Sequence, residues 1–174
     1  MSGITKSITK AAFGLLFCLI SLNATEARAL EPAKGDVVLT VSGAIANTNA
    51  GETAEFDTAM LEAIGTVTFE TETTWTEGVQ TFTGVELSDL LSVLGVNGSQ
   101  LRATAVNDYA VDIPTGDAVE GGPIVAFLRN GELMSLRDKG PLWIVYPYDS
   151  SPKYRTEVIF SRSIWQLDRI EVLP

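Results

Sequence analysis

The sequence predicts an α+β domain that is compact and mostly β, with two or more short helices. Three observations predict it. Short β-rich runs recur through residues 30–174 and are separated by glycine, proline and asparagine. Two segments combine helix boundary signals with an apolar face. The connections around those helices are too short for a doubly wound parallel sheet. No repeat or linker interrupts residues 30–174, so we expect one domain there.

Residues 1–29 are expected to be a signal peptide. Two lysines precede an uncharged apolar run at 11–22, and Ala27-Arg28-Ala29 supplies the small residues that a signal peptidase reads. The run is shorter than the about 20 residues of a membrane-spanning helix. We therefore expect cleavage, a periplasmic mature chain and no membrane insertion afterwards. A retained membrane anchor and a lipoprotein modified at Cys18 are the alternatives.

The mature chain is strongly acidic. The whole sequence has 12 basic and 22 acidic residues; residues 1–29 contain three and one of these, which leaves nine and 21 and a net charge of −12. Such a chain repels nucleic acid and anionic lipid, so neither is expected as a partner. Seven of the nine remaining basic residues lie at 129–169, so a bound anion would have to sit near the C-terminal half.

Two chemically important residue types are missing from the mature chain. The sequence has no histidine, and its one cysteine, Cys18, lies in the expected signal peptide. This excludes a disulfide, the usual zinc sites, and Ser-His-Asp or Cys-His catalysis. Carboxylates, lysine, tyrosine and serine remain. We therefore assign no catalytic and no metal-binding residue, and we favour a protein that is not an enzyme.

Two elements should open the domain. Residues 37–41 are rich in valine and predict a strand that stops at a Ser-Gly pair. A short helix should begin after Asp57, a natural N-cap. Phe56 and Leu61 have the spacing of a hydrophobic staple, and Gly65 should end the helix.

A threonine-rich strand over 66–75 and the clearest helix of the chain should follow. Alternation places Val67, Phe69 and Thr73 on one face of this strand. Thr83 and Glu86 have the spacing of a capping box, and Gly95 is the predicted C-cap. The helix between them carries its leucines on one face, at positions 87, 90, 91 and 94.

The C-terminal half should consist of strands. The extended runs lie at 101–106, 110–113, 124–128, 142–146 and 164–173. Asn130-Gly131 predicts a type I′ hairpin turn.

Polar or aromatic residues that interrupt these runs are the candidate ligand-binding residues. Asn107, Asp108 and Tyr109 separate two strands, where they form either a plain turn or a site. Arg162, Ser163 and Trp165 precede the last strand, where a core tryptophan beside a surface arginine is the alternative. Trp75 is the seventh candidate, and it too fits an ordinary core position.

Several motifs together resemble the molybdopterin-binding domain of the sulfite oxidase family. They are Val41-Ser42-Gly43, the segment FTGVELSDLL at 82–91, Asn107-Asp108-Tyr109 with Ile113-Pro114, and GPLWIVYP at 140–147, where Trp143 replaces a residue that is often basic in the enzymes. The resemblance covers most of 36–174. It implies the fold of that domain and a pterin-shaped pocket.

One departure from the family is decisive. In the enzymes a cysteine thiolate just before the helix motif binds molybdenum, whereas residues 71–76 here contain no cysteine. The histidines and the arginine cluster that hold the cofactor's phosphate are also missing. We therefore do not expect the molybdenum cofactor. An oxidoreductase, or an accessory subunit of one, is the alternative.

Residues 161–172, SRSIWQLDRIEV, resemble a segment of small periplasmic proteins that keep this fold without the metal ligand. That resemblance implies a reduced pterin as ligand and, as partner, a membrane-bound regulator of cyclic di-GMP turnover. In such a site Asp108 would accept hydrogen bonds from the pterin, Asn107 and Arg162 would donate, and Trp75 or Trp165 would stack on the ring. A structural or adhesion domain without a ligand is the second alternative.

Overall fold

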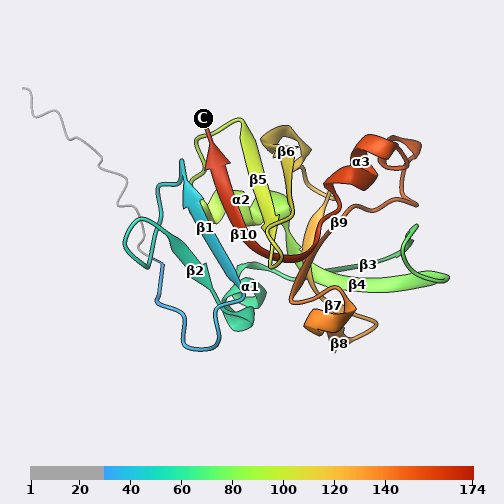
Figure 1. The fold of residues 1–174 in the computed structure, drawn as a ribbon, viewed down its shortest axis with the longest axis horizontal. Coiled ribbons are helices and arrows are strands. Elements are labelled where there is room, and N and C mark those ends of the chain that lie inside the picture. The colour runs from blue at the N-terminus through green and yellow to red at the C-terminus, as the bar shows by residue number, and fades with distance from the viewer. Residues whose placement is uncertain (1–29) are drawn as a thin grey trace, which may run out of the picture.

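The computed structural model describes residues 30–174, so the expected signal peptide lies outside the described residues (Figure 1). The strands are β1 Leu39–Gly43, β2 Ala54–Phe56, β3 Val67–Glu72, β4 Val79–Glu86, β5 Gln100–Ala105, β6 Ala110–Pro114, β7 Ile124–Arg129, β8 Glu132–Leu133, β9 Leu142–Val145 and β10 Trp165–Leu173. The helices are α1 Thr58–Ile64, α2 Leu87–Leu94 and α3 Glu157–Arg162, with 3₁₀ turns η1 Thr115–Asp117, η2 Leu136–Asp138 and η3 Pro152–Tyr154. The predicted α+β, mostly-β class is confirmed.

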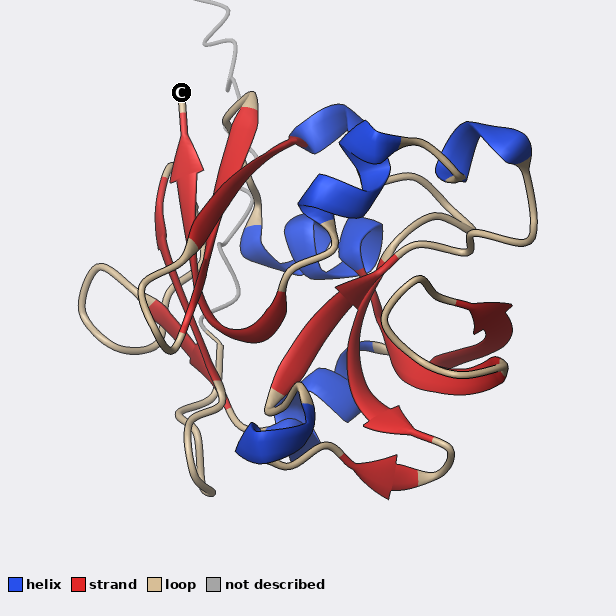
Figure 2. Cartoon of the chain, turned by 45° about the vertical axis from the view of Figure 1, so that its right-hand side comes forward, coloured by secondary structure: helices blue, strands red, loops and turns tan. Residues whose placement is uncertain are grey.

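The strands form one strongly curled sheet (Figure 2). Its main path runs β2-β1-β10-β9-β7-β4-β3, and the β5–β6 hairpin joins it through β10. β10 pairs in parallel with β1, and the other strand pairs are antiparallel. The register of β10 shifts between Trp165 and Leu167 and again between Leu167 and Arg169. Such bulges bend a strand, and here they let β10 join the two halves of the sheet.

Local signals placed several elements correctly. Asp57 caps α1 by accepting a hydrogen bond from the Met60 backbone N–H, and Gly65 follows its last residue. The four leucines of α2 are buried, and Gly95 ends that helix in the left-handed conformation. Asn130 and Gly131 have φ of 54° and 81°, as a type I′ turn requires.

The prediction of a capping box at Thr83 and Glu86 was wrong. Both residues belong to β4, an element that the sequence did not reveal, and Glu86 makes no side-chain capping bond. β4 is held between β3 and β7, and the Leu87 N–H donates to the Pro123 carbonyl. Sheet pairing on both sides therefore outweighs the local capping preference.

One strand boundary and one helix also differ from the prediction. The strand expected to reach residue 75 ends at Glu72, where the carboxylate of Asp149 accepts its backbone N–H at 2.7 Å. α3 lies in a stretch to which the sequence assigned no element. Within residues 30–174, no helix is long and apolar enough to cross a membrane.

The cap at Asp57 should make stability depend on pH. Hydrogen bonds from the backbone of Gly35, then Met60 and Lys34, lower the pKa of this carboxyl from 3.8. Its stabilising effect is therefore complete above that value and disappears as the pH falls through the lower pKa of the folded state. Asp57→Asn puts an amide donor among backbone donors, and we expect it to lower Tm by roughly 3–6 °C at pH 7. Thermal unfolding from pH 7 to 2 should show the gap between the two proteins shrinking below pH 3.8; a gap that does not change with pH would contradict this role.

Candidate functional site

A cavity of about 590 Å³ opens beside α3, where the β5–β6 turn meets the start of β10. Its walls come from the turn after β3 (Thr74, Trp75), from the β5–β6 turn, from α3 and from residues 163–166. The floor is buried and the rim, which includes Asn107 and Glu157, is exposed. The volume suits a small organic molecule.

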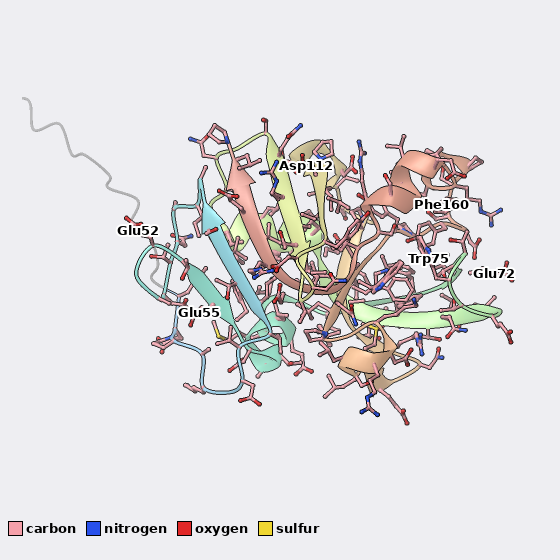
Figure 3. All side chains as sticks on the ribbon, viewed as in Figure 1. Glu52, Glu55, Glu72, Trp75, Asp112 and Phe160 are labelled. Atoms are coloured by element: carbon pink, nitrogen blue, oxygen red, sulfur yellow. The ribbon has the colours of Figure 1, made fainter. Side chains whose placement is uncertain are left out.

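Trp75 is the centre of an aromatic cluster at this cavity. Its ring centroid lies 5.5 Å from that of Trp165 and 6.0 Å from that of Phe160, both edge to face. Figure 3 shows Trp75 beneath Phe160 of α3. Behind it, Trp143 and Tyr148 lie 5.9 Å and 6.3 Å away, again edge to face. These contacts hold the indole in place and favour a flat, apolar-faced ligand.

Two amides of the cavity wall are oriented by their own hydrogen bonds. The Asn107 Oδ1 accepts the Tyr109 backbone N–H at 3.2 Å, which leaves the Nδ2 group as a donor. The Gln166 Nε2 donates to the Leu136 carbonyl at 2.7 Å, which leaves Oε1 as an acceptor. Gln166 adopts a φ of 53° in the first bulge of β10. Each hydrogen bond therefore leaves one atom of the amide, a donor on Asn107 and an acceptor on Gln166, without a partner among the described residues.

Glu157 is the one charged side chain among the residues that line the cavity, all of which lie within 30–174. It is the first residue of α3, directly after the N-cap Thr156, whose side chain accepts the Ile159 N–H. Its carboxylate forms no hydrogen bond or ion pair with another residue of the described chain. Glu157 is thus an acceptor at the rim with its hydrogen-bonding capacity unused.

The structure brings five of the seven sequence-predicted residues together at this cavity: Trp75, Asn107, Tyr109, Ser163 and Trp165. Ser163 is buried and already committed to the protein. It donates to the Ile159 carbonyl at 2.9 Å and forms a 2.6 Å hydrogen bond with the Tyr148 hydroxyl. Burial raises the pKa of Tyr148 to about 12, so that hydroxyl stays neutral.

Asp108 does not reach the cavity. It adopts a φ of 65°, and its side chain, 84% exposed, lies 2.7 Å from the Arg169 guanidinium. In this left-handed turn the carboxylate points toward β10, while its neighbours Asn107 and Tyr109 line the cavity. Glu157, and not Asp108, is the carboxylate that lines the cavity.

Arg162 also lies outside the cavity wall. Its Nη1 contacts both carboxylate oxygens of Asp117, at 3.2 Å and 2.9 Å. The Tyr146 hydroxyl donates to the same carboxylate at 2.7 Å, and burial raises the pKa of Tyr146. Arg162 therefore anchors the end of α3 to η1 instead of facing a ligand.

Sequence reasoning missed Glu157, Phe160 and Gln166. α3 has only six residues, too few for a helical repeat of apolar residues to mark it. The signal that could have revealed it is Thr156, which caps α3.

Comparison with known proteins finds a similarity in structure. No protein-family model and no curated protein matches the sequence. Among solved structures, the chain is similar to the sulfane dehydrogenase SoxCD from Paracoccus pantotrophus, with a TM-score of 0.58 and 20% identity. The match covers 83% of this chain and 40% of that one. The likeness confirms the fold predicted from the sequence, a compact domain of the sulfite oxidase type.

The donor atoms at the cavity do not fit a molybdenum centre. Residues 30–174 contain no cysteine or histidine, and their carboxylates form no group of three that could hold a metal ion. In the enzymes that the sequence resembles, a thiolate binds molybdenum, whereas the cavity wall after β3 offers the hydroxyl of Thr74 and the indole of Trp75. The arrangement suits binding of a flat heterocycle.

Proposed function

We propose that this protein is a periplasmic binding protein for a reduced pterin and that it regulates a membrane-bound signalling partner. The observation that supports a pterin as the ligand is the aromatic cavity with Glu157, Asn107 and Gln166 around it. These three side chains supply two acceptors and a donor that the described residues leave unused. Of the three, Gln166 is half-buried, while Asn107 and Glu157 lie on the exposed rim; polar groups that a bound ring covers and leaves unpaired would give the site its selectivity.

The chemistry of a pterin matches these groups. Its 2-amino group and adjacent ring N–H are donors side by side, which a carboxylate such as Glu157 accepts as a pair. Its carbonyl oxygen accepts from an amide such as Asn107 Nδ2, and the Gln166 Oε1 accepts a further ring N–H. The flat ring packs on the indoles of Trp75 and Trp165.

Charge favours the simple pterin over the molybdenum cofactor. Molybdopterin carries a phosphate, whose binding calls for Arg, Lys or a helix N-terminus built for anions. No basic side chain lines the cavity within residues 30–174, and its one charged group is the carboxylate of Glu157. A neutral ring meets no repulsion there, whereas a phosphate would.

The regulatory part of the proposal rests on the resemblance of residues 161–172 to the small periplasmic proteins. The partner would be a membrane sensor that controls cyclic di-GMP turnover. In the structure this segment contributes the end of α3, the cavity wall at Trp165 and the sheet strand β10. A ligand can signal only if bound and free forms differ where the partner binds.

Anaerobic titration calorimetry with tetrahydrobiopterin tests the site. We expect Glu157→Gln to weaken binding by about tenfold, because the amide offers one acceptor where two are needed. Asp108→Asn is the matched control. It removes another exposed carboxylate, one that lies outside the cavity, and should change affinity by less than about twofold.

Each result has a clear meaning. A loss with Asp108→Asn and none with Glu157→Gln would restore the original sequence assignment and contradict the site described above. Absence of binding by folded, ligand-free wild type to any reduced pterin would overturn the proposal and favour a structural domain. Stoichiometric molybdenum in protein from its native host would favour the oxidoreductase alternative.

A further inference from the structure

A lysine lies directly over one wall of the cavity. Lys139 follows η2, and its Nζ is 4.2 Å from the ring centroid of Trp165 and 5.3 Å from that of Trp143. Lys139 itself does not line the cavity, whereas Trp165 does. The ammonium group can therefore affect a ligand in the cavity only through its effect on the Trp165 indole.

The backbone holds this arrangement rigidly. The Lys139 carbonyl accepts the Gln166 N–H at 3.0 Å, and the Gln166 Nε2 donates to the Leu136 carbonyl. These two bonds fasten the η2 turn to the first bulge of β10, next to Trp165. Lys139 adopts a φ of 67°, a left-handed conformation that is uncommon for a lysine.

The surroundings of the ammonium group support a specific role. Lys139 is half-buried, and desolvation, followed by the charge of Arg129, lowers its pKa, while Asp138 opposes that change. A cation that gives up hydration beside an aromatic face interacts with that face more strongly than an exposed one.

We propose that Lys139 is a specificity-determining residue that makes the cavity favour an electron-rich, reduced pterin ring over its oxidised form; this rests on the function proposed above. The ammonium draws π-electron density of Trp165 toward itself. The rest of the indole surface becomes less negative and attracts an electron-rich ring more strongly. Reduction of a pterin removes the conjugation of its pyrazine ring and leaves an electron-rich aminopyrimidinone, so the two oxidation states differ in this property.

The experiment compares tetrahydrobiopterin with biopterin, which share the same side chain. Their dissociation constants are measured anaerobically for wild type, Lys139→Met and Lys139→Arg. We expect Lys139→Met to reduce the preference for the reduced ring by about two- to fivefold. Lys139→Arg keeps a cation over the indole and should retain the preference.

Lys153 offers a matched control. Its Nζ lies 4.6 Å from the ring centroid of Tyr154, and neither residue lines the cavity. Lys153→Met should leave both dissociation constants unchanged. The tryptophan emission of ligand-free protein is a second readout: Lys139→Met should change it, whereas Lys139→Arg and Lys153→Met should change it less.

The two proposals fail in different ways. If wild type binds neither pterin, the proposed function is wrong. If wild type binds and Lys139→Met keeps the same ratio of dissociation constants, the role of Lys139 is overturned while the pterin site stands. If Lys139→Met does not fold, Lys139→Gln replaces it. A loss of preference with Lys139→Arg equal to that with the neutral variant would also contradict the role of the charge.

Discussion

Trp143→Ala is expected to lower the free energy of unfolding by about 3–5 kcal/mol. Trp143 is fully buried in β9, and its ring lies 5.2 Å from that of Phe82 and 5.9 Å from that of Trp75. Its indole N–H donates to the Ser163 carbonyl at 3.3 Å. The alanine variant loses the apolar contacts, leaves a cavity beside Phe82 and Trp75, and leaves that carbonyl without its donor.

Equilibrium denaturation in guanidinium chloride measures this effect. Trp165→Ala is the comparison, because Trp165 is half-exposed at the cavity and should cost clearly less stability. Trp143 stands where the enzymes that the sequence resembles often carry a basic residue. An alanine variant of unchanged stability would mean that this position is not part of the core. Equal losses for the two variants would also contradict the burial described above.

Trp75→Ala should raise the dissociation constant for tetrahydrobiopterin by roughly 30- to 150-fold. Its indole is half-buried and has aromatic rings around it, so the ligand meets a surface that is already ordered. The alanine variant loses the packing surface and loosens the neighbouring Trp165 and Phe160. Anaerobic calorimetry measures the change, with circular dichroism to confirm folding.

A graded pair makes this prediction sharper. Trp75→Phe keeps an aromatic face and should retain a substantial part of the affinity. Phe69→Ala removes a half-buried ring of β3 that does not line the cavity, and it should lower stability with little effect on binding. Unchanged affinity in Trp75→Ala would remove this indole from the site.

Local sequence signals predicted those elements whose boundaries depend on neighbours in the chain. The Asp57 cap and the Asn130-Gly131 turn are of this kind. β4 was missed because its identity depends on pairing with β7, some forty residues away, while Thr83 and Glu86 offered a competing local pattern.

The candidate site was predictable in its location and less so in its orientation. Pairing of Leu167 with Ala105 brings the interrupted strands together, so Asn107 and Trp165 share one cavity as expected. The direction of a side chain in a turn depends on φ, and the left-handed conformation of Asp108 turns its carboxylate away. Glu157 could be predicted as a cavity residue only if α3 was predicted first, and the composition of the sequence did not reveal that helix.

The position of β10 has a consequence for the order in which the chain folds. The strand β10, residues 165–173, is the last described strand. It pairs with the first one, β1, as well as with β5 and β9. Contacts between such distant segments fold slowly, since the loop between them must close first. The sheet is therefore complete only when β10 has paired with β1, at the opposite end of the described residues.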